Sequence, residues 1–542
     1  MPALLEIDGL RVEFGHKPVV DDVSLRLEGG RTLALVGESG SGKSITALSA
    51  MRLLPFAARI SQGAIRLDGN DLLKLPETAM QAMRGGRIGM IFQEPQSSLN
   101  PVMRIGDQIA ETLRAHTGLG RDAVRDRVIE LLEAVGISDA VRRYRDYPHQ
   151  FSGGMKQRVM IAIAIAAEPD VLVADEPTTA LDVTTQAQVL GLLRQLQRER
   201  GMSMLFITHD LAVAQKMADQ VAVMRNGRVV EQGAAGSFFA APGHEYSRSL
   251  FSALPTPEKR QRDGIDKVDS DAEMVLEVRD LKVHFPIRRG VFRKVVGQVR
   301  AVDGVSVAIR KGHTVAVVGE SGSGKTTMGK GLLQLVTPTA GAVMHDDEDL
   351  ASLSERELRA RRSLLQIVFQ DPFSSMNPRM MITDIIQEGM IAQGIGSSRI
   401  DREQRVDELL GQVGLLSAHK YRYPHEFSGG QRQRICIARA LAVEPELIVC
   451  DEPTSALDVS VQAQILALLR ELQVELGIAY LFITHNVAVV EYLAHEVIVM
   501  RDGRVVEQGS VDAVLRNPSE AYTRELLAAV PRLELPPGIA SA

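Results

Sequence analysis

Four motifs occur twice in this chain, in the same order each time. They read GESGSGK followed by Ser or Thr, FSGG followed by a basic stretch, DEPT followed by ALD, and FITH. The copies lie at residues 37–44 and 319–326, 151–158 and 427–434, 175–182 and 451–458, and 206–210 and 482–486. The last three pairs are 276 residues apart and the first pair is 282 apart. This period is far above that of a solenoid repeat, so duplication of a whole domain is the better interpretation.

The duplication divides the 542 residues into two domains and a connecting segment. We predict a first domain over residues 1–255, a charged linker over 256–274 and a second domain over 275–542. Ten of the eighteen residues 256–273 are charged, which predicts a solvated segment. The second copy also has extra residues near 286–296 and a shorter stretch after its glycine-rich motif, which together explain the different spacing of the first motif pair.

Short apolar runs end at the polar motifs and predict buried strands. The runs are 32–36, 171–174 and 204–207, with copies at 314–318, 447–450 and 480–483. Uninterrupted apolar runs are typical of strands covered on both faces, as in a parallel sheet. Helical spacing of apolar residues appears within 124–135 and again within 406–413. The sequence therefore predicts an α/β fold in each copy, with a helical insert before the FSGG motif.

The glycine-rich motif has the pattern of a phosphate-binding loop. Glycines let backbone N–H groups converge on phosphate oxygens, and the following helix directs its positive end toward them. Lys43 and Lys325 are predicted to neutralise the β and γ phosphates, and Ser44 and Thr326 to ligate Mg²⁺. A chance match in one glycine-rich turn is conceivable, but two matches in register, each between a strand-like and a helix-compatible run, are not. The predicted ATP-binding residues are Gly37, Glu38, Ser39, Gly40, Ser41, Gly42, Lys43 and Ser44, with Gly319, Glu320, Ser321, Gly322, Ser323, Gly324, Lys325 and Thr326 in the second copy.

An acidic pair closes one apolar strand in each copy, and a histidine closes the next. Asp175 and Asp451 are predicted to hold the Mg²⁺ shell. The adjacent Glu176 and Glu452 are predicted to orient and polarise the attacking water. The alternative is a pair of surface acids at a strand end, but packing does not explain such a pair before Pro-Thr. The predicted γ-phosphate contacts are His209 and His485, although a lone histidine is more often structural.

Together these motifs resemble the ATP-binding-cassette (ABC) superfamily, and the resemblance covers nearly the whole chain twice. Its most specific element is the SGGQ-type signature between the glycine loop and the acidic pair. The signature residues are Ser152, Gly153, Gly154 and Met155 in the first copy, and Ser428, Gly429, Gly430 and Gln431 in the second. The resemblance implies two P-loop cassettes, each with an α/β core, a helical subdomain and an antiparallel β part. It also implies head-to-tail stacking, in which each ATP lies between one copy's loop and the other copy's signature.

The same resemblance assigns four further residues to the ATP sites. Gln93 and Gln370 match the family's Q-loop, which contacts the metal, senses the γ-phosphate and touches the membrane partner. Phe14 matches the aromatic residue that stacks on adenine, and Phe285 is its counterpart, although a core role is an equal alternative for both. Because both copies keep the lysine, the acidic pair and the histidine, we expect two competent sites. Met155 departs from the family pattern because methionine cannot make the hydrogen bonds of glutamine.

Residues around the Q-loop and at the end of each copy resemble one subgroup of the family. QEPQSSLNP at 93–101 and QDPFSSMNPRM at 370–380 look like the ATPases of oligopeptide, dipeptide and nickel importers, as do the tails at 246–255 and 522–531. Fusion of two cassettes in one chain is similar to the glutathione-type and microcin- or peptide-type importer ATPases. Some of these proteins bind an iron–sulfur cluster through cysteines after the tail. This chain has none there, so we expect no cluster.

The resemblance implies partners that the chain itself does not contain. These are two membrane-spanning permease subunits and a periplasmic solute-binding protein, with the chain on the cytoplasmic face of the inner membrane. No run approaches the ~20 apolar residues of a membrane span. A net charge of −6 gives no basic footprint for nucleic acid, and two cysteines lacking metal-ligand spacing fit a reducing compartment. The transported solute cannot be identified from these residues.

Two other classes of tandem ABC ATPase remain as alternatives. Ribosome-binding translation factors carry a different loop after Glu-Pro-Thr and a long basic linker, whereas this chain has TALD, SALD and a short linker of mixed charge. DNA-repair ATPases carry zinc-binding cysteines, and two cysteines cannot build such sites. The sequence therefore favours an importer ATPase over both.

Overall fold

The apolar runs that end at the polar motifs form the centre of two similar units. We describe the fold from a computed structural model, for residues 3–179, 181–265, 272–289, 292, 294–455 and 457–534. Among these, the first unit contains residues 3–252 and 531–534, and the second contains residues 253–530. No helix of this described part is both long enough and apolar enough to cross a membrane.

Each unit has a six-stranded central sheet, in the order β10-β9-β3-β8-β7-β6 in the first unit and β20-β19-β13-β18-β17-β16 in the second. In the first unit these are β3 (Thr32–Val36), β6 (Ile88–Ile91), β7 (Val171–Asp175), β8 (Ser203–Thr208), β9 (Gln220–Arg225) and β10 (Arg228–Ala234). In the second they are β13 (Thr314–Val318), β16 (Leu365–Val368), β17 (Leu447–Asp451), β18 (Ala479–Ile483), β19 (Glu496–Arg501) and β20 (Arg504–Ser510). All pairings are parallel except those of β10 and β20. The predicted parallel sheet and its three buried strands per copy are confirmed, and every residue of β3, β7 and β8 is buried.

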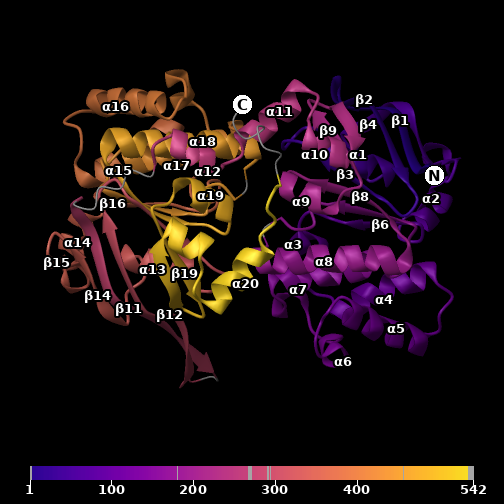
Figure 1. The fold of residues 1–542 in the computed structure, drawn as a ribbon, viewed down its shortest axis with the longest axis horizontal. Helices are drawn as coiled ribbons and strands as arrows, with labels where there is room; N and C mark the ends of the chain where they lie inside the picture. Colours follow the sequence, from indigo (N-terminus) through magenta and orange to yellow (C-terminus); the bar gives the residue numbers. More distant parts are fainter. Residues whose placement is uncertain are drawn as a thin grey trace. The chain divides into compact units, whose positions relative to one another are not determined.

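An antiparallel sheet of four strands accompanies each central sheet, in the order β2-β1-β4-β5 and β12-β11-β14-β15. Its strands are β1 (Ala3–Phe14), β2 (Lys17–Glu28), β4 (Ala58–Leu67), β5 (Asn70–Asp71), β11 (Met274–Arg289), β12 (Lys294–Arg310), β14 (Ala340–His345) and β15 (Glu348–Asp349). The extra residues predicted near 286–296 lengthen the β11–β12 hairpin, whose strands have 16 and 17 residues against 12 each in β1 and β2. Figure 1 shows this hairpin extending past the other strands of its own sheet.

Helices fill the connections between the strands of both sheets. The first unit has α1 (Lys43–Ala50), α2 (Glu77–Met83), α3 (Pro95–Ser98), α4 (Ile105–His116), α5 (Arg121–Ala134), α6 (Ala140–Arg143), α7 (Gly153–Ala164), α8 (Val183–Arg200), α9 (Leu211–Met217), α10 (Ala235–Ala240) and α11 (Glu245–Ala253). The second has α12 (Pro257–Arg262), α13 (Lys325–Leu332), α14 (Glu355–Arg361), α15 (Ile382–Gln393), α16 (Arg399–Gln412), α17 (Gly429–Leu441), α18 (Val459–Leu476), α19 (Val487–Leu493) and α20 (Ala521–Ala529).

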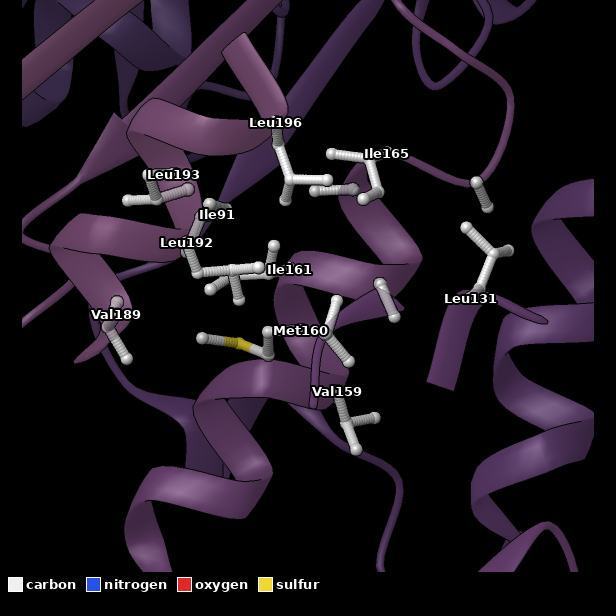
Figure 2. Close-up of a cluster of buried hydrophobic side chains, with 14 of the residues drawn as sticks. Ile91, Leu131, Val159, Met160, Ile161, Ile165, Val189, Leu192, Leu193 and Leu196 are labelled. Carbon is white, nitrogen blue, oxygen red and sulfur yellow. The ribbon is translucent and has the colours of Figure 1, made fainter. Parts of the chain in front are cut away.

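The predicted helical insert lies between β6 and β7, and between β16 and β17 in the second unit. Figure 1 shows α4, α5 and α6 gathered beside α7. The apolar residues that predicted a helix over 124–135 are buried on one face of α5. In Figure 2, Leu131 of α5 faces a cluster in which Ile161 of α7 and Ile165, directly after α7, lie against Leu192 and Leu196 of α8. The signature helix α7 is therefore held by apolar contacts on both sides.

The charged segment between the copies is solvated only in part, since Glu258, Gln261, Arg262 and Gly264 are exposed whereas Arg260 and Ile265 are buried. Arg260 of α12 is only 8% exposed, and its guanidinium donates to the carbonyls of Glu491 (3.1 Å) and Ala494 (2.5 Å). These carbonyls belong to the end of α19, where the last turn of a helix leaves acceptors unpaired and favours positive charge. Ile265 is also buried, within a hydrophobic core cluster of the second unit. The remaining predicted linker residues 266–271 lie outside the described ranges.

Candidate functional site

The glycine-rich motif forms a loop between β3 and α1 in the first unit, and between β13 and α13 in the second. Gly42 has a φ of 104°, and a Cβ there would lie 2.8 Å from the carbonyl oxygen of Val19. At Gly37 a Cβ would meet the carbonyl oxygen of Met224 at 2.3 Å. No side chain fits at either position, because the backbone of neighbouring strands presses against the loop. The strand–loop–helix context predicted for the motif is present in both units.

The loop lysines curl back into their own loops. Lys43 Nζ donates to the carbonyl oxygens of Gly37 (2.7 Å) and Glu38 (2.8 Å), and Lys325 makes the same bonds in the second unit at 2.9 and 2.8 Å. The hydroxyls of Ser41 and Ser323 are buried and have no hydrogen-bond partner among the described residues. A buried donor without a partner is costly unless a ligand supplies the acceptor. The loop therefore fits an anion that brings several oxygen atoms.

A hydroxyl and a carboxyl meet where the loop helix faces the end of β7 or β17. Ser44 Oγ donates to Asp175 Oδ1 at 3.0 Å, and Thr326 Oγ1 donates to Asp451 Oδ1 at 2.9 Å. Burial raises the pKa of Asp175 to about 6, and the charge of Glu176 adds to this effect. The pKa of Asp451 is raised for the same reasons. Two oxygen ligands of this kind fit Mg²⁺, which usually takes one or two protein ligands and completes its shell with phosphate oxygens and water.

The glutamates next to these aspartates are held in a different electrostatic state. Glu176 Oε2 accepts from Gln93 Nε2 (2.9 Å) and Thr179 Oγ1 (2.9 Å) and lies 3.3 Å from His209 Nδ1. Burial alone would raise the pKa of Glu176, but the hydrogen bond and charge of His209 outweigh it and lower the pKa to about 2. One strand end thus carries a carboxyl that protonates readily beside one that stays ionised.

The second unit repeats this arrangement with one difference. Glu452 accepts from Gln370 Nε2 at 2.8 Å and lies 3.4 Å from His485 Nδ1, and its pKa is lowered in the same way, against burial. The residue that corresponds to Thr179 is Ser455, whose hydroxyl donates to the backbone carbonyl of Glu452 and not to its carboxylate. Thr179 was not among the predicted site residues. Only its place in the repeated motif, three residues after the glutamate, could have indicated it.

Both glutamates adopt a backbone conformation that is rare for residues other than glycine. Their φ values are 45° for Glu176 and 48° for Glu452. Such a conformation costs on the order of 1–3 kcal/mol and persists only where neighbours enforce it. Here each glutamate N–H donates to the adjacent strand, to Ile207 O (3.0 Å) or to Ile483 O (2.9 Å). The sheet therefore fixes where the carboxylate points.

Gln93 and Gln370 reach this site from the loops after β6 and β16. They were predicted to contact the metal, and the structure places their amide groups on Glu176 and Glu452, the neighbours of the predicted metal-binding aspartates. Each unit thus brings together its lysine, hydroxyl, aspartate, glutamate, glutamine and histidine at the carboxyl ends of its strands.

The signature residues begin α7 and α17 in the helical parts. Ser152 Oγ accepts from the N–H of Met155 at 3.3 Å. Ser428 and Gln431 bond reciprocally, since Ser428 Oγ accepts from Gln431 N–H (3.4 Å) while Gln431 Oε1 accepts from Ser428 N–H (3.1 Å). The departure noted at Met155 therefore removes one of the two bonds of a capping box.

Neither predicted adenine-stacking residue belongs to a buried core cluster. Phe14 is the last residue of β1 and is partly exposed, and Phe285 lies within β11 with 42% of its surface exposed. The two residues have different partners on the neighbouring strand: Phe14 of β1 pairs with Lys17 of β2, and Phe285 of β11 pairs with Val299 of β12. The exposure disfavours the alternative of a core role, most clearly for Phe285.

Comparison with known proteins gives a consistent result along the whole chain. The family model described as "ABC transporter" matches residues 20–179 and 302–455. The model described as "Oligopeptide/dipeptide transporter, C-terminal region" matches residues 230–279 and 506–539. It therefore follows the first match in both copies and includes the predicted tails.

Curated relatives match nearly the full length. An "Uncharacterized ABC transporter ATP-binding protein YejF" of Escherichia coli K12 is 49% identical, covering 97% of this chain and 99% of the relative. A "Peptidoglycan transport ATP-binding protein YejF" of Agrobacterium fabrum is also 49% identical, over 98% of this chain and 97% of the relative. A "Glutathione import ATP-binding protein GsiA" of Salmonella paratyphi A is 45% identical, over 97% and 89%.

Proposed function

Because the chain belongs to the ABC transporter family and is an ATPase built from two of its cassettes, we propose that it energises an importer of peptide-containing solutes. The observation that carries this proposal is the match to the oligopeptide and dipeptide transporter C-terminal region after each cassette. That match disfavours the ribosomal and DNA-repair alternatives. Two relatives carry peptidoglycan transport and glutathione import in their names, and both solutes contain short peptides.

We assign the phosphate and metal contacts from the geometry of each strand end. Lys43 and the N–H groups of residues 37–44 would hold the β and γ phosphates, and Ser44 with Asp175 would hold Mg²⁺. The ion would draw charge from the phosphate oxygens. Lys325, Thr326 and Asp451 do the same in the second cassette. The buried hydroxyls of Ser41 and Ser323, which have no hydrogen-bond partner in the part of the chain that the structure describes, support an anion at this place.

Hydrolysis requires a water aligned with the γ-phosphate and a group that polarises it. Glu176 is ionised at neutral pH and is oriented by Gln93, Thr179 and His209, so it accepts a hydrogen bond from that water. His209 lies against the same carboxylate and is placed to contact the γ-phosphate. Glu452, Gln370 and His485 perform these roles in the second cassette.

We further propose that the two cassettes close head to tail around ATP. The loop that contains Lys43 would then be completed by residues 428–431, and the loop that contains Lys325 by residues 152–155. The signature helices begin with exposed Ser-Gly sequences, whose N–H groups can bind phosphate oxygens. Phe14 and Phe285 would stack on adenine. The proposed domain limits remain residues 1–255, 256–274 and 275–542.

The channel and the solute receptor would come from other chains. We propose two permease subunits, a periplasmic binding protein and a position on the cytoplasmic face of the inner membrane. Large apolar side chains lie exposed beside the Q-loops, namely Phe92 (39%), Val102 (80%) and Phe373 (44%). Exposed apolar groups gathered around a ligand-responsive loop are suited to binding a partner protein.

The function is tested by uptake in a strain that lacks this chain. We expect loss of uptake of labelled glutathione, a dipeptide or a peptidoglycan-derived peptide, with restoration by the wild-type chain. The Glu176→Gln and Glu452→Gln double variant should bind ATP with near-normal affinity, hydrolyse it at least about 100-fold more slowly and fail to restore uptake. Normal uptake of all three solutes in the deletion strain would refute the peptide-importer proposal, and near-normal hydrolysis in the double variant would remove both glutamates from the mechanism.

A further inference from the structure

Helices α11 and α20, in the tails of the two cassettes, each place a tyrosine beside the phosphate loop of their own unit. Tyr246 is the second residue of α11 and Tyr522 the second residue of α20, and both are buried, with 4% and 8% of their surface exposed. The hydroxyl of Tyr522 accepts a hydrogen bond from the N–H of Glu320 at 3.3 Å. Glu320 is the second residue of the loop GESGSGK.

The first unit has the same pairing of residues. The hydroxyl of Tyr246 is buried beside Glu38, the second residue of its own loop, but unlike the hydroxyl of Tyr522 it has no hydrogen-bond partner among the described residues. Burial raises the pKa of Tyr246 to about 12, and the charge of Glu38 contributes to this rise. The phenol group of Tyr246 is therefore neutral at physiological pH.

Each tyrosine ring is held by the strand that also closes the loop. The guanidinium of Arg225 lies 4.6 Å from the ring centroid of Tyr246, and that of Arg501 lies 4.7 Å from the ring of Tyr522. These arginines end β9 and β19 and directly follow Met224 and Met500. The carbonyls of those methionines are the atoms that press against the first glycine of each loop. Loop, strand end and tyrosine thus form one packed unit.

The start of each tail helix is itself fixed to the adjacent strand. Glu231 of β10 accepts from the N–H groups of Gly243 (2.6 Å) and His244 (3.1 Å). Glu507 of β20 accepts from the N–H groups of Ser519 (2.7 Å) and Glu520 (3.3 Å). A carboxylate that accepts two backbone N–H groups at a helix start gives strong, charge-assisted anchoring. The tyrosine position is therefore set by β10 or β20 and not by the helix alone.

The peptide group that Tyr522 reaches is one that the loop lysine contacts, and Tyr246 lies beside the corresponding residue of the first loop. In the second unit the N–H of Glu320 bonds to Tyr522, while its carbonyl oxygen accepts from Lys325 Nζ at 2.8 Å. In the first unit the carbonyl of Glu38 accepts from Lys43 Nζ at 2.8 Å. We propose that Tyr246 and Tyr522 are positioning residues, through which the tail of each cassette holds its phosphate loop in the shape that binds ATP.

This inference rests on the proposed role of the loop in binding the ATP phosphates. A loop held in its binding conformation before ATP arrives loses less conformational entropy on binding. Removal of the hydroxyl should therefore weaken ATP binding more than it slows hydrolysis. Hydrolysis should change less because the residues proposed to act on the water, such as Glu176, Gln93 and His209, lie outside the phosphate loop.

The first test measures loop mobility in the nucleotide-free full-length chain by hydrogen exchange. Tyr522→Phe removes only the hydroxyl, so exchange at residues 319–323 should quicken while residues 37–41 keep their wild-type rate. Tyr246→Phe should quicken exchange at residues 37–41 and leave residues 319–323 at their wild-type rate, with a smaller change because the Tyr246 hydroxyl has no hydrogen-bond partner among the described residues. Tyr492→Phe is the matched control, because it also removes a hydroxyl from a mostly buried tyrosine, one that donates to Asp263 away from the loop. The proposal would be overturned if both loops exchanged at their wild-type rates in the Tyr522→Phe and Tyr246→Phe variants.

The second test separates ATP affinity from turnover in the Tyr246→Phe and Tyr522→Phe double variant. We expect the Kd and KM for ATP to rise about threefold to tenfold, as for loss of the Tyr522 hydrogen bond, with kcat changed less than about twofold. Tyr492→Phe should leave all three values unchanged. An unchanged Kd in the double variant, or an equal rise in Tyr492→Phe, would overturn the positioning role. Lys43→Ala with Lys325→Ala tests the loop itself, since intact ATP binding there would instead refute the proposed function.

Discussion

At the scale of residues, the central feature is a pair of neighbouring carboxyl groups with opposite pKa shifts. Asp175 is raised to about 6 by burial, whereas Glu176 is lowered to about 2 because His209 outweighs burial. The sequence predicted which residues would meet, since an acidic pair closing an apolar strand has few structural explanations. It could not predict the opposite shifts, which depend on Gln93, Thr179 and His209 arriving from separate segments.

The raised pKa predicts that Asp175 destabilises the nucleotide-free protein at neutral pH. The folded state holds a proton up to about pH 6 and the unfolded chain only to about pH 3.8, so the stability from this group is lost as pH rises between these values. Asp175→Asn should therefore increase the free energy of unfolding by about 1–3 kcal/mol more at pH 7.5 than at pH 4, while it abolishes turnover at that site.

Denaturant unfolding without Mg²⁺ or ATP at the two pH values checks this expectation. Asp139→Asn is the control, because the Asp139 side chain is exposed and the substitution should have only a small effect on stability. The interpretation of Asp175 as a destabilising, functional charge fails if Asp175→Asn lowers the stability equally at both pH values.

At the scale of elements, residues 32–36 and 314–318 were predicted as strands with the bounds that β3 and β13 have. This succeeded because each run is apolar after its first residue, a threonine, and ends at a glycine of the loop. Two features could not be predicted from local pattern. Arg260 is buried because the end of α19 offers carbonyls to it, and the tyrosines of the tails meet loops that lie about 200 residues away. Both are contacts between distant segments.

The two signature helices differ in how their first turn is capped. Substituting Met155 by Gln and Gln431 by Met should exchange the two capping patterns. Met155→Gln should allow the side chain to accept from the N–H of Ser152, as Gln431 does for Ser428. Such a bond contributes about 0.5–1 kcal/mol to a helix start. Hydrogen exchange at the Ser152 amide should therefore slow by roughly twofold to fivefold. Gln431→Met is the reciprocal control and should quicken exchange at Ser428, whereas identical rates before and after both exchanges would show that the box is not formed.

At the scale of the whole molecule, the duplication was predicted from four motif pairs, and the ABC transporter family model matches the chain twice, over residues 20–179 and 302–455. Each unit contains a full set of the residues proposed to contact phosphate, metal and water. We propose that each ATP is shared between the two copies. The central claim is therefore that the loop of one cassette works with the signature of the other.

The most direct test of this claim compares two double-mutant cycles on ATP turnover. Lys43→Ala should be strongly non-additive with Ser428→Ala, with a coupling energy above about 1 kcal/mol, because both residues would serve one site. Lys43→Ala with Ser152→Ala is the matched control and should be additive within about 0.5 kcal/mol, since Ser152 would serve the other site. Coupling of Lys43 to Ser152 in place of Ser428, or equal coupling to both, would contradict the account.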